Sequence, residues 1–252
     1  MVSSNYKLFR LIFLLIIACP IFIARCGDDK GTGAGISVNR KGELEIIFSS
    51  DEKIRGADFL SKATFGFGMP QRAADKVWVE NGVLSLQWNE KSIIYTMNIF
   101  CCPIEENEFH STRQAVIIRL HGENTDVEYK DAHAGFLILT NGKRAGFEFQ
   151  EGVVQIKDGD RVFNLVAIEI PAGCHVDKKK DLFVFSGNMP PGTTGYMVFK
   201  IPVRVDSDFD TMSRLVNLDY EDCLNMFKKA FKTTGGQLWM EKGSVFYQKT
   251  GQ

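Results

Sequence analysis

Residues 76–88 read KVWVENGVLSLQW, and this stretch decides the fold. On both sides of Asn81-Gly82, apolar and polar residues alternate, which is typical of strands with one buried face. Both central residues of a type I′ turn need a positive φ, and asparagine and glycine tolerate this best. The stretch therefore predicts a β-hairpin with strands at residues 76–80 and 83–88.

Other segments rich in β-branched and aromatic residues are separated by turn residues and predict further strands. We expect these strands at residues 43–48, 92–100, 114–121, 134–140, 145–149, 153–156, 161–170, 182–185 and 196–205. Both alternating faces of residues 162–170 are largely apolar, so this strand should be central and covered on both sides. The pattern predicts an all-β fold, an antiparallel β-sandwich or jelly-roll-like domain, and argues against parallel α/β nucleotide folds.

The pattern changes after residue 206, where apolar residues recur at helical spacing. Acidic residues gather near the start of this segment, lysines near its end, and Gly235-Gly236 follows. We expect one amphipathic C-terminal helix at residues 217–232. A short terminal hairpin is expected at residues 238–240 and 244–248.

The N-terminus has the pattern of an export signal. Lys7 and Arg10 precede an apolar run at residues 11–24, and small residues lie near its end. We expect residues 1–26 to be a signal peptide, residues 27–35 a flexible tether and residues 36–252 a single sandwich domain. The protein should then be secreted, or anchored on the outside of the cytoplasmic membrane.

Three fates of the signal remain open. Cleavage after Cys26 would release the protein, and retention of the apolar run would anchor it, although Pro20 and Arg25 interrupt a clean span. In the third fate a lipid is attached to Cys26, because the following charged, glycine-rich residues resemble the start of mature bacterial lipoproteins. Arg25 departs from the small residue usual before such a cysteine. Cys19 fits that rule better, but lipidation there would leave residues 20–23 in the mature tether.

Composition limits the partners. The formal net charge is −1, which gives no electrostatic footprint for nucleic acid and no basic stripe for anionic lipid. Membrane association is therefore expected only through the N-terminal segment.

Four cysteines follow the signal, and an exported chain can pair them in at most two disulfides; they are Cys101, Cys102, Cys174 and Cys223. Buried thiols are the alternative, and adjacent cysteines on a strand would point to opposite faces.

An acidic run at Asp206, Asp208 and Asp210 is the candidate metal site. Carboxylates two residues apart can converge on one calcium ion in a curled backbone. The rest of the loop departs from an EF-hand, since its sixth position is Thr211 and its twelfth is Asn217. A solvated acidic turn leading into a helix explains the same residues, so no cofactor is expected beyond this candidate calcium ion.

Two histidine–carboxylate pairs could combine a base with an acid. His121 and Glu123 are two residues apart, as are Asp131 and His133, so each pair would share a strand face. The sequence contains no Gly-x-Ser-x-Gly, His-Glu-x-x-His or phosphate-binding Gly-x-x-x-x-Gly-Lys-Ser/Thr signature. The catalytic residues of an enzyme, if any, are therefore unknown from the sequence.

The segment from Ala57-Asp58-Phe59 to Leu86, with its strand, glycine turn and strand, resembles the opening of concanavalin-like sandwiches. This resemblance implies the sandwich fold and sugar binding. The laminarinase-like enzymes of that superfamily carry Glu-x-Asp-x-x-Glu on one strand, and this sequence has no match to it. Aromatic faces stack on pyranose rings, which makes Trp78, Trp88 and Tyr95 candidate ligand-binding residues, although tryptophans in sandwiches are often core residues.

These observations favour an exported or membrane-tethered, non-enzymatic binding or surface-structural module. Its expected partner is a glycan or another envelope or extracellular protein. A carbohydrate-active enzyme, a glycoside hydrolase or lyase on a concanavalin-like sandwich, is the alternative, because sandwich loops can bring distant residues together.

Overall fold

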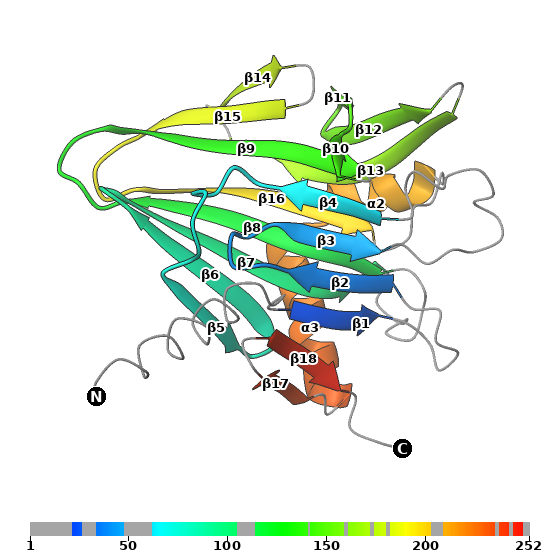
Figure 1. Cartoon of the computed structure of the whole chain (residues 1–252). Helices are drawn as coiled ribbons and strands as arrows, with labels where there is room; N and C mark the ends of the chain where they lie inside the picture. Colours follow the sequence, from blue (N-terminus) through cyan, green and yellow to red (C-terminus); the bar gives the residue numbers. More distant parts are fainter. Residues whose placement is uncertain are drawn as a thin grey trace, which may run out of the picture.

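The computed structural model describes residues 22–26, 34–47, 62–104, 114–140, 142–158, 161–171, 174–179, 182–202, 209–234, 237–241 and 244–248. Two mostly antiparallel sheets pack face to face and form a β-sandwich, and two helices cover part of one sheet (Figure 1). The predicted all-β sandwich is confirmed.

The ten-stranded sheet has the order β14-β15-β9-β4-β3-β2-β1-β18-β17, with β10 paired to β9. Its strands are β1 (Phe22–Cys26), β2 (Ala34–Val38), β3 (Leu44–Ile47), β4 (Lys62–Gly66), β9 (Lys130–Thr140), β10 (Lys143–Arg144), β14 (His175–Lys179), β15 (Leu182–Met189), β17 (Gln237–Glu241) and β18 (Ser244–Gln248). The pairing of β1 with β18 is parallel.

The eight-stranded sheet has the order β11-β12-β13-β16-β8-β7-β6-β5. Its strands are β5 (Lys76–Glu80), β6 (Val83–Glu90), β7 (Ile93–Pro103), β8 (Gln114–Asn124), β11 (Glu148–Gln150), β12 (Val153–Asp158), β13 (Arg161–Glu169) and β16 (Thr194–Pro202). As predicted, β13 is an inner strand. It lies between β12 and β16 and has buried residues on both faces.

The hairpin that decided the fold forms as predicted. Asn81 and Gly82 have φ angles of 49° and 79°, both in the left-handed region that a type I′ turn requires. The turn sets the pairing of Glu80 with Val83, and the register of β5 and β6 follows from it.

Aromatic rings fill the centre of the core between the two sheets. The ring of Phe136 on β9 lies 5.3 Å from that of Phe199 on β16, measured between centroids. It lies 5.7 Å from Phe147, 5.9 Å from Phe67 and 6.3 Å from Phe65. Phe136 is fully buried and joins both sheets.

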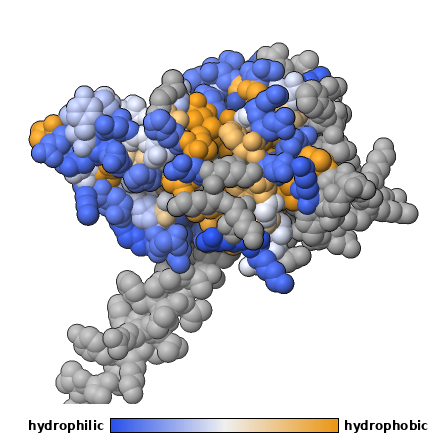
Figure 2. Space-filling model, turned by 90° about the horizontal axis from the view of Figure 1, so that it is seen from above, coloured by the Kyte–Doolittle hydropathy of each residue, from blue (hydrophilic) through white to orange (hydrophobic). Residues whose placement is uncertain are grey.

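Viewed from above, the molecule exposes hydrophobic residues in the middle of one side, with hydrophilic residues around them (Figure 2). Val162 on β13 is 43% exposed and Val176 on the edge strand β14 is 37% exposed. Apolar residues exposed to this extent are normal on a protein surface.

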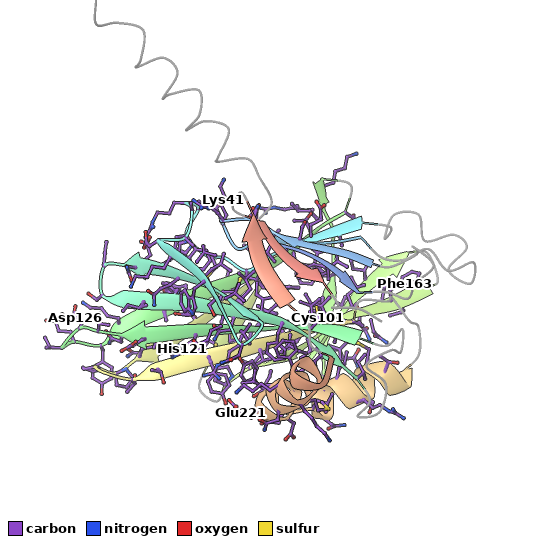
Figure 3. All side chains as sticks on the ribbon, turned by 90° about the horizontal axis from the view of Figure 1, so that it is seen from below. Lys41, Cys101, His121, Asp126, Phe163 and Glu221 are labelled. Atoms are coloured by element: carbon purple, nitrogen blue, oxygen red, sulfur yellow. The ribbon has the colours of Figure 1, made fainter. Side chains whose placement is uncertain are left out.

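A second apolar layer lies between the eight-stranded sheet and the helices. Phe100 on β7 contacts Tyr220 and Phe227, with ring centroids 5.7 Å and 5.2 Å apart. Cys223 and Leu215 are buried in the same cluster. The molecule therefore has three layers in the order ten-stranded sheet, eight-stranded sheet, helices (Figure 3).

Where the sequence predicted one helix at residues 217–232, the structure has two: α2 (Phe209–Asn217) and α3 (Tyr220–Thr234). Asp219 separates them by capping α3. Its carboxylate accepts a hydrogen bond from the backbone N–H of Glu221 at 2.6 Å, and its carbonyl accepts the N–H of Cys223 at 3.1 Å. An aspartate that caps a helix has a non-helical backbone, so the chain bends there.

The N-terminal strand β1 falls within the segment expected to be a signal peptide. It pairs with β2 from Phe22↔Val38 to Cys26↔Ala34 and connects β2 to β18. In addition, β2 begins at Ala34, inside the expected tether. Residues 1–21 lie outside the described residues, and no helix among the described residues is long and apolar enough to cross a membrane.

We predict that Phe136→Ala will lower the free energy of unfolding by about 3–5 kcal/mol, because it removes a large side chain from the centre of the core. Tyr129→Ala is the control, since Tyr129 is 65% exposed, and it should change stability by no more than about 0.5 kcal/mol. Urea unfolding followed by circular dichroism measures both. Equal stability of the two variants would contradict the placement of Phe136.

Candidate functional site

Strand alternation divides the eight-stranded sheet into an inner and an outer face. On β7 and β8, Met97, Ile99, Ile118 and Leu120 lie in the core between the sheets. The residues between them must point outward, because successive side chains of a strand alternate. Outside the area covered by helices, these outward residues are polar or aromatic, with the exception of Ile94. We call seven of the polar and aromatic ones the polar face: Trp78, Gln87, Thr96, Asn98, Arg119, His121 and Tyr196.

The strand register brings the polar face together from five strands. In one row Trp78 pairs with Ser85, Ser85 with Asn98, and Asn98 with Arg119. In the next row Gln87 pairs with Thr96, Thr96 with His121, and His121 with Tyr196. Neighbouring strands lie about 4.8 Å apart, so each row presents its side chains at contact spacing.

Helix α3 borders the polar face. Phe100 and Ile117, which lie in the row beside Asn98 and Arg119, are buried beneath the helices. Figure 3 shows His121 and Glu221 on the same side of the molecule, where the sheet meets α3. The first turn of α3 therefore covers the apolar rows of the sheet, and the polar face begins next to that turn.

Arg119 is held at this border by two aromatic rings. Its guanidinium lies 5.0 Å from the ring centroid of Tyr196 and 4.7 Å from that of Tyr220. One guanidinium nitrogen also lies 3.4 Å from a carboxylate oxygen of Glu221. The Nε atom is buried, and none of the described residues accepts a hydrogen bond from it. These two cation–π contacts restrict the orientation of this side chain.

His121 is kept in its neutral form. Burial lowers the pKa of its imidazole, the charge of Arg119 lowers it further, and Glu123 opposes the shift. A neutral imidazole carries one hydrogen-bond donor and one acceptor. At neutral pH His121 can therefore both donate to a ligand and accept from it.

Uncharged groups occupy the strands between Trp78 and Arg119. The hydroxyl of Ser85 donates a hydrogen bond of 2.9 Å to the amide oxygen of Asn98. The side-chain oxygen of Asn98 is therefore used by Ser85 within the sheet, and the NH₂ group of Asn98 points away from Ser85. Gln87 and Thr96 are half-buried beside it.

The three aromatic residues expected to bind a ligand do not form one platform. Trp88 is fully buried in the core and donates from its indole nitrogen to the carbonyl of Arg72 at 3.1 Å. Tyr95 packs against the same core. Trp78 lies between the inward-facing Val77 and Val79 and is half-buried on the outer face. The candidate platform is corrected accordingly, since only Trp78 belongs to the polar face.

The two histidine–carboxylate pairs also lie apart. His121 and Glu123 are on the outer face of the eight-stranded sheet. Asp131 and His133 are on the outer face of the ten-stranded sheet, because Ala134 and Phe136 on the same strand point into the core. The full sandwich separates the pairs. Among the described residues, no group of three or more histidine, cysteine or acidic side chains could hold a metal ion.

The remaining candidates lie at or beyond the limits of the described residues. Asp206 and Asp208 fall outside them, and of Asp210 only the backbone is described, as part of α2. The candidate calcium ion therefore stays a prediction. The backbone of Cys26, the lipidation candidate, belongs to β1 and pairs with Ala34.

Sequence reasoning missed Arg119, Tyr196 and Tyr220 as neighbours. One local signal was available, since Arg119, His121 and Glu123 alternate with small or apolar residues along the end of a strand. The contact with Tyr196 and Tyr220 joins segments far apart in the chain. Their proximity follows from strand order, which no local pattern encodes.

Comparison with known proteins gives little beyond the fold. No protein-family model matches the chain, and no curated protein matches it. Among solved structures, one similar chain is a putative kojibiose phosphorylase from human microbiome. It is 6% identical, with a TM-score of 0.37, over 82% of this chain and 30% of its own length. At this level the similarity carries no argument about function.

We predict that the titration midpoint of His121, followed by NMR, will lie below the ordinary histidine pKa of about 6.5. In Arg119→Met it should move upward, because the repelling charge is gone, while burial still holds it below the ordinary value. Folded His121 resists protonation, so its contribution to stability should fall as pH drops through about 6.5. The His121 midpoint of the wild type, measured under the same conditions, is the reference. An unchanged His121 midpoint in Arg119→Met would contradict this account.

Proposed function

We propose that this protein is an exported, non-enzymatic binding module that holds a carbohydrate on its polar face. The observation that carries the proposal is the register of β5 to β8. It places the indole of Trp78 in one row with Asn98 and Arg119, and His121 in the row beside it. An apolar ring and several fixed hydrogen-bonding groups are thus presented together.

The chemistry of the polar face suits a neutral ligand rich in hydroxyl groups. Each sugar hydroxyl both donates and accepts hydrogen bonds, and the side chains of Gln87, Thr96 and His121 offer both kinds of partner. The apolar face of a pyranose ring complements an aromatic ring such as Trp78. Arg119 is paired with Glu221, so the site does not depend on an anionic ligand.

The geometry gives less support to the enzyme alternative. Acid–base catalysis needs a proton donor and a base within reach of one substrate bond. Beside the polar face, Glu123 is exposed and Glu221 pairs with Arg119, while His121 and Tyr196 are titratable residues of the face itself. A carbohydrate-active enzyme remains the alternative that the following experiment separates from binding.

We predict that Trp78→Ala will weaken retention on a glycan array at least tenfold, because it removes the stacking ring. This loss corresponds to about 1.4 kcal/mol of binding free energy. Trp88→Phe is the matched control from the same hairpin. It should lower the melting temperature, because Trp88 is a core residue, and leave glycan retention unchanged.

A reducing-sugar release assay on the same glycans tests the alternative. No release, together with retention that depends on Trp78, supports the binding module. Release that Glu123→Gln abolishes would overturn the non-enzyme proposal. Equal retention by wild type and Trp78→Ala would exclude the polar face as the glycan-binding site. It would favour a protein partner instead.

We further propose that the exported protein is tethered by a lipid on Cys19. Cleavage after Cys26 would remove β1, which makes five residue pairs with β2 and connects it to β18. Cleavage before Cys19 keeps this strand. Residues 22 and 23 are apolar and would be unfavourable in an exposed tether. In the structure they belong to β1 and therefore to the sheet. Ile16-Ile17-Ala18 provides the small residue expected before an acylated cysteine.

We predict that mass spectrometry of the mature protein will find an acylated Cys19 at its N-terminus. Cys19→Ala should abolish the acylation, and Cys26→Ala, the matched control, should keep it. Gly27 as the first residue, or an acylated Cys26, would contradict the proposal and mean that β1 is absent from the mature protein. An intact Met1 in a cytosolic fraction would refute export itself.

A further inference from the structure

We propose that Cys102 and Cys223 form a disulfide bond that fastens α3 to the eight-stranded sheet. The thiol of Cys102 on β7 lies 3.4 Å from the carbonyl oxygen of Cys223 on α3 and donates to it. The two thiol groups are also in hydrogen-bonding contact. Both cysteines are buried in the layer between the sheet and the helices. The inference rests on the proposed export, because disulfides persist in oxidising compartments.

Strand alternation selects this pair among the four cysteines whose side chains the structure describes, Cys101, Cys102, Cys174 and Cys223. Cys101 and Cys102 are adjacent on β7 and therefore point to opposite faces of the sheet. Cys101 packs against the core between the two sheets, as does Cys174. Cys102 and Cys223 belong to the helix layer on the other side. The sheet itself thus separates Cys101 from Cys223.

In the docked state, the surroundings make Cys223 the more acidic of the two thiols. Contact with the thiol of Cys102 lowers the pKa of Cys223, and the charge of Lys200 lowers it further, although burial opposes both. Lys200 is itself buried, donates to the carbonyl of Leu218 and lies 3.6 Å from a carboxylate oxygen of Glu169. The pKa of Cys102 is raised by its hydrogen bond with Cys223 and by burial. Thiolates, not thiols, attack disulfides.

The oxidant is a disulfide donor, such as oxidised glutathione or the disulfide of a thiol oxidoreductase. The thiolate of one cysteine of the pair attacks one donor sulfur and forms a mixed disulfide, and the first donor thiol leaves. As the helix docks, the other cysteine loses its proton and attacks the sulfur of the first, which releases the second donor thiol. The two cysteines give up two electrons and two protons, which the donor's S–S bond takes up as two thiols.

The burial of both cysteines determines the stage of folding at which this oxidation happens. Cys223 is 0% exposed and Cys102 is 2% exposed, so a donor cannot reach them when α3 lies on the sheet. Oxidation therefore takes place while the helix docks, during folding. Once formed, the bond holds the helix whose first turn carries Tyr220 and Glu221, and both of these residues contact Arg119 at the border of the polar face.

Peptide mapping under non-reducing conditions tests the pairing. One sample is wild-type protein recovered from the producing cells, and the other is purified reduced protein refolded with oxidised glutathione. Both are unfolded in urea so that buried thiols can be reached, blocked with N-ethylmaleimide at acidic pH and digested without reductant. We expect a peptide containing Cys102 linked to one containing Cys223, and maleimide on Cys101 and Cys174. Fragmentation of the linked peptides distinguishes Cys101 from Cys102 in the wild type, so the result does not depend on the folding of a variant.

Matched variants add a second reading. Cys101→Ala should keep the linked peptide, and Cys102→Ala should lose it. A link through Cys101, or maleimide on both Cys102 and Cys223 in both samples, would overturn the proposal. A link found after refolding with glutathione but absent from the protein in cells would support the pairing and count against export. The two proposals can thus fail separately.

Discussion

The structure depends on one constraint, the burial of the eight-stranded sheet on both faces. The inner residues of β7, β8 and β16 pack against the ten-stranded sheet, and over part of these strands the outer residues pack against the helix layer. In that part each strand must alternate two apolar sets in a fixed register, because a shift by one residue would exchange the two faces. This requirement positions the helices and everything beside them.

The same alternation explains how the polar face arises. The outer face of β8 consists of Ala115, Ile117, Arg119, His121 and Glu123 in succession. The first two lie beneath the helix layer, and the polar residues follow where that cover ends. The boundary between apolar and polar residues on one strand thus coincides with the edge of α3. Helix docking and the polar face are two consequences of one sequence pattern.

Much of the fold could be predicted from the sequence because its signals are local. The turn at Asn81-Gly82 and the apolar faces of β13 depend on neighbouring residues, and both were predicted correctly. The strand β14 was missed because His175–Lys179 is rich in charged residues and lies at a sheet edge, where burial leaves little pattern. The break between α2 and α3 was missed because Asp219 reads as one of several acidic residues near a helix start.

The site was less predictable, although part of it was within reach. Trp78 lies between two inward valines, whereas Trp88 has the parity of Leu84 and Leu86, so the alternation along each strand alone separates the two indoles. The meeting of Arg119 with Tyr196 and Tyr220 is different, since it needs strand order and helix placement. Contacts with the first turn of α3 orient the side chain of Arg119, and Arg119 is itself part of the polar face. Any interaction that holds α3 on the sheet therefore also preorganises the face, and a preorganised site loses less entropy on binding.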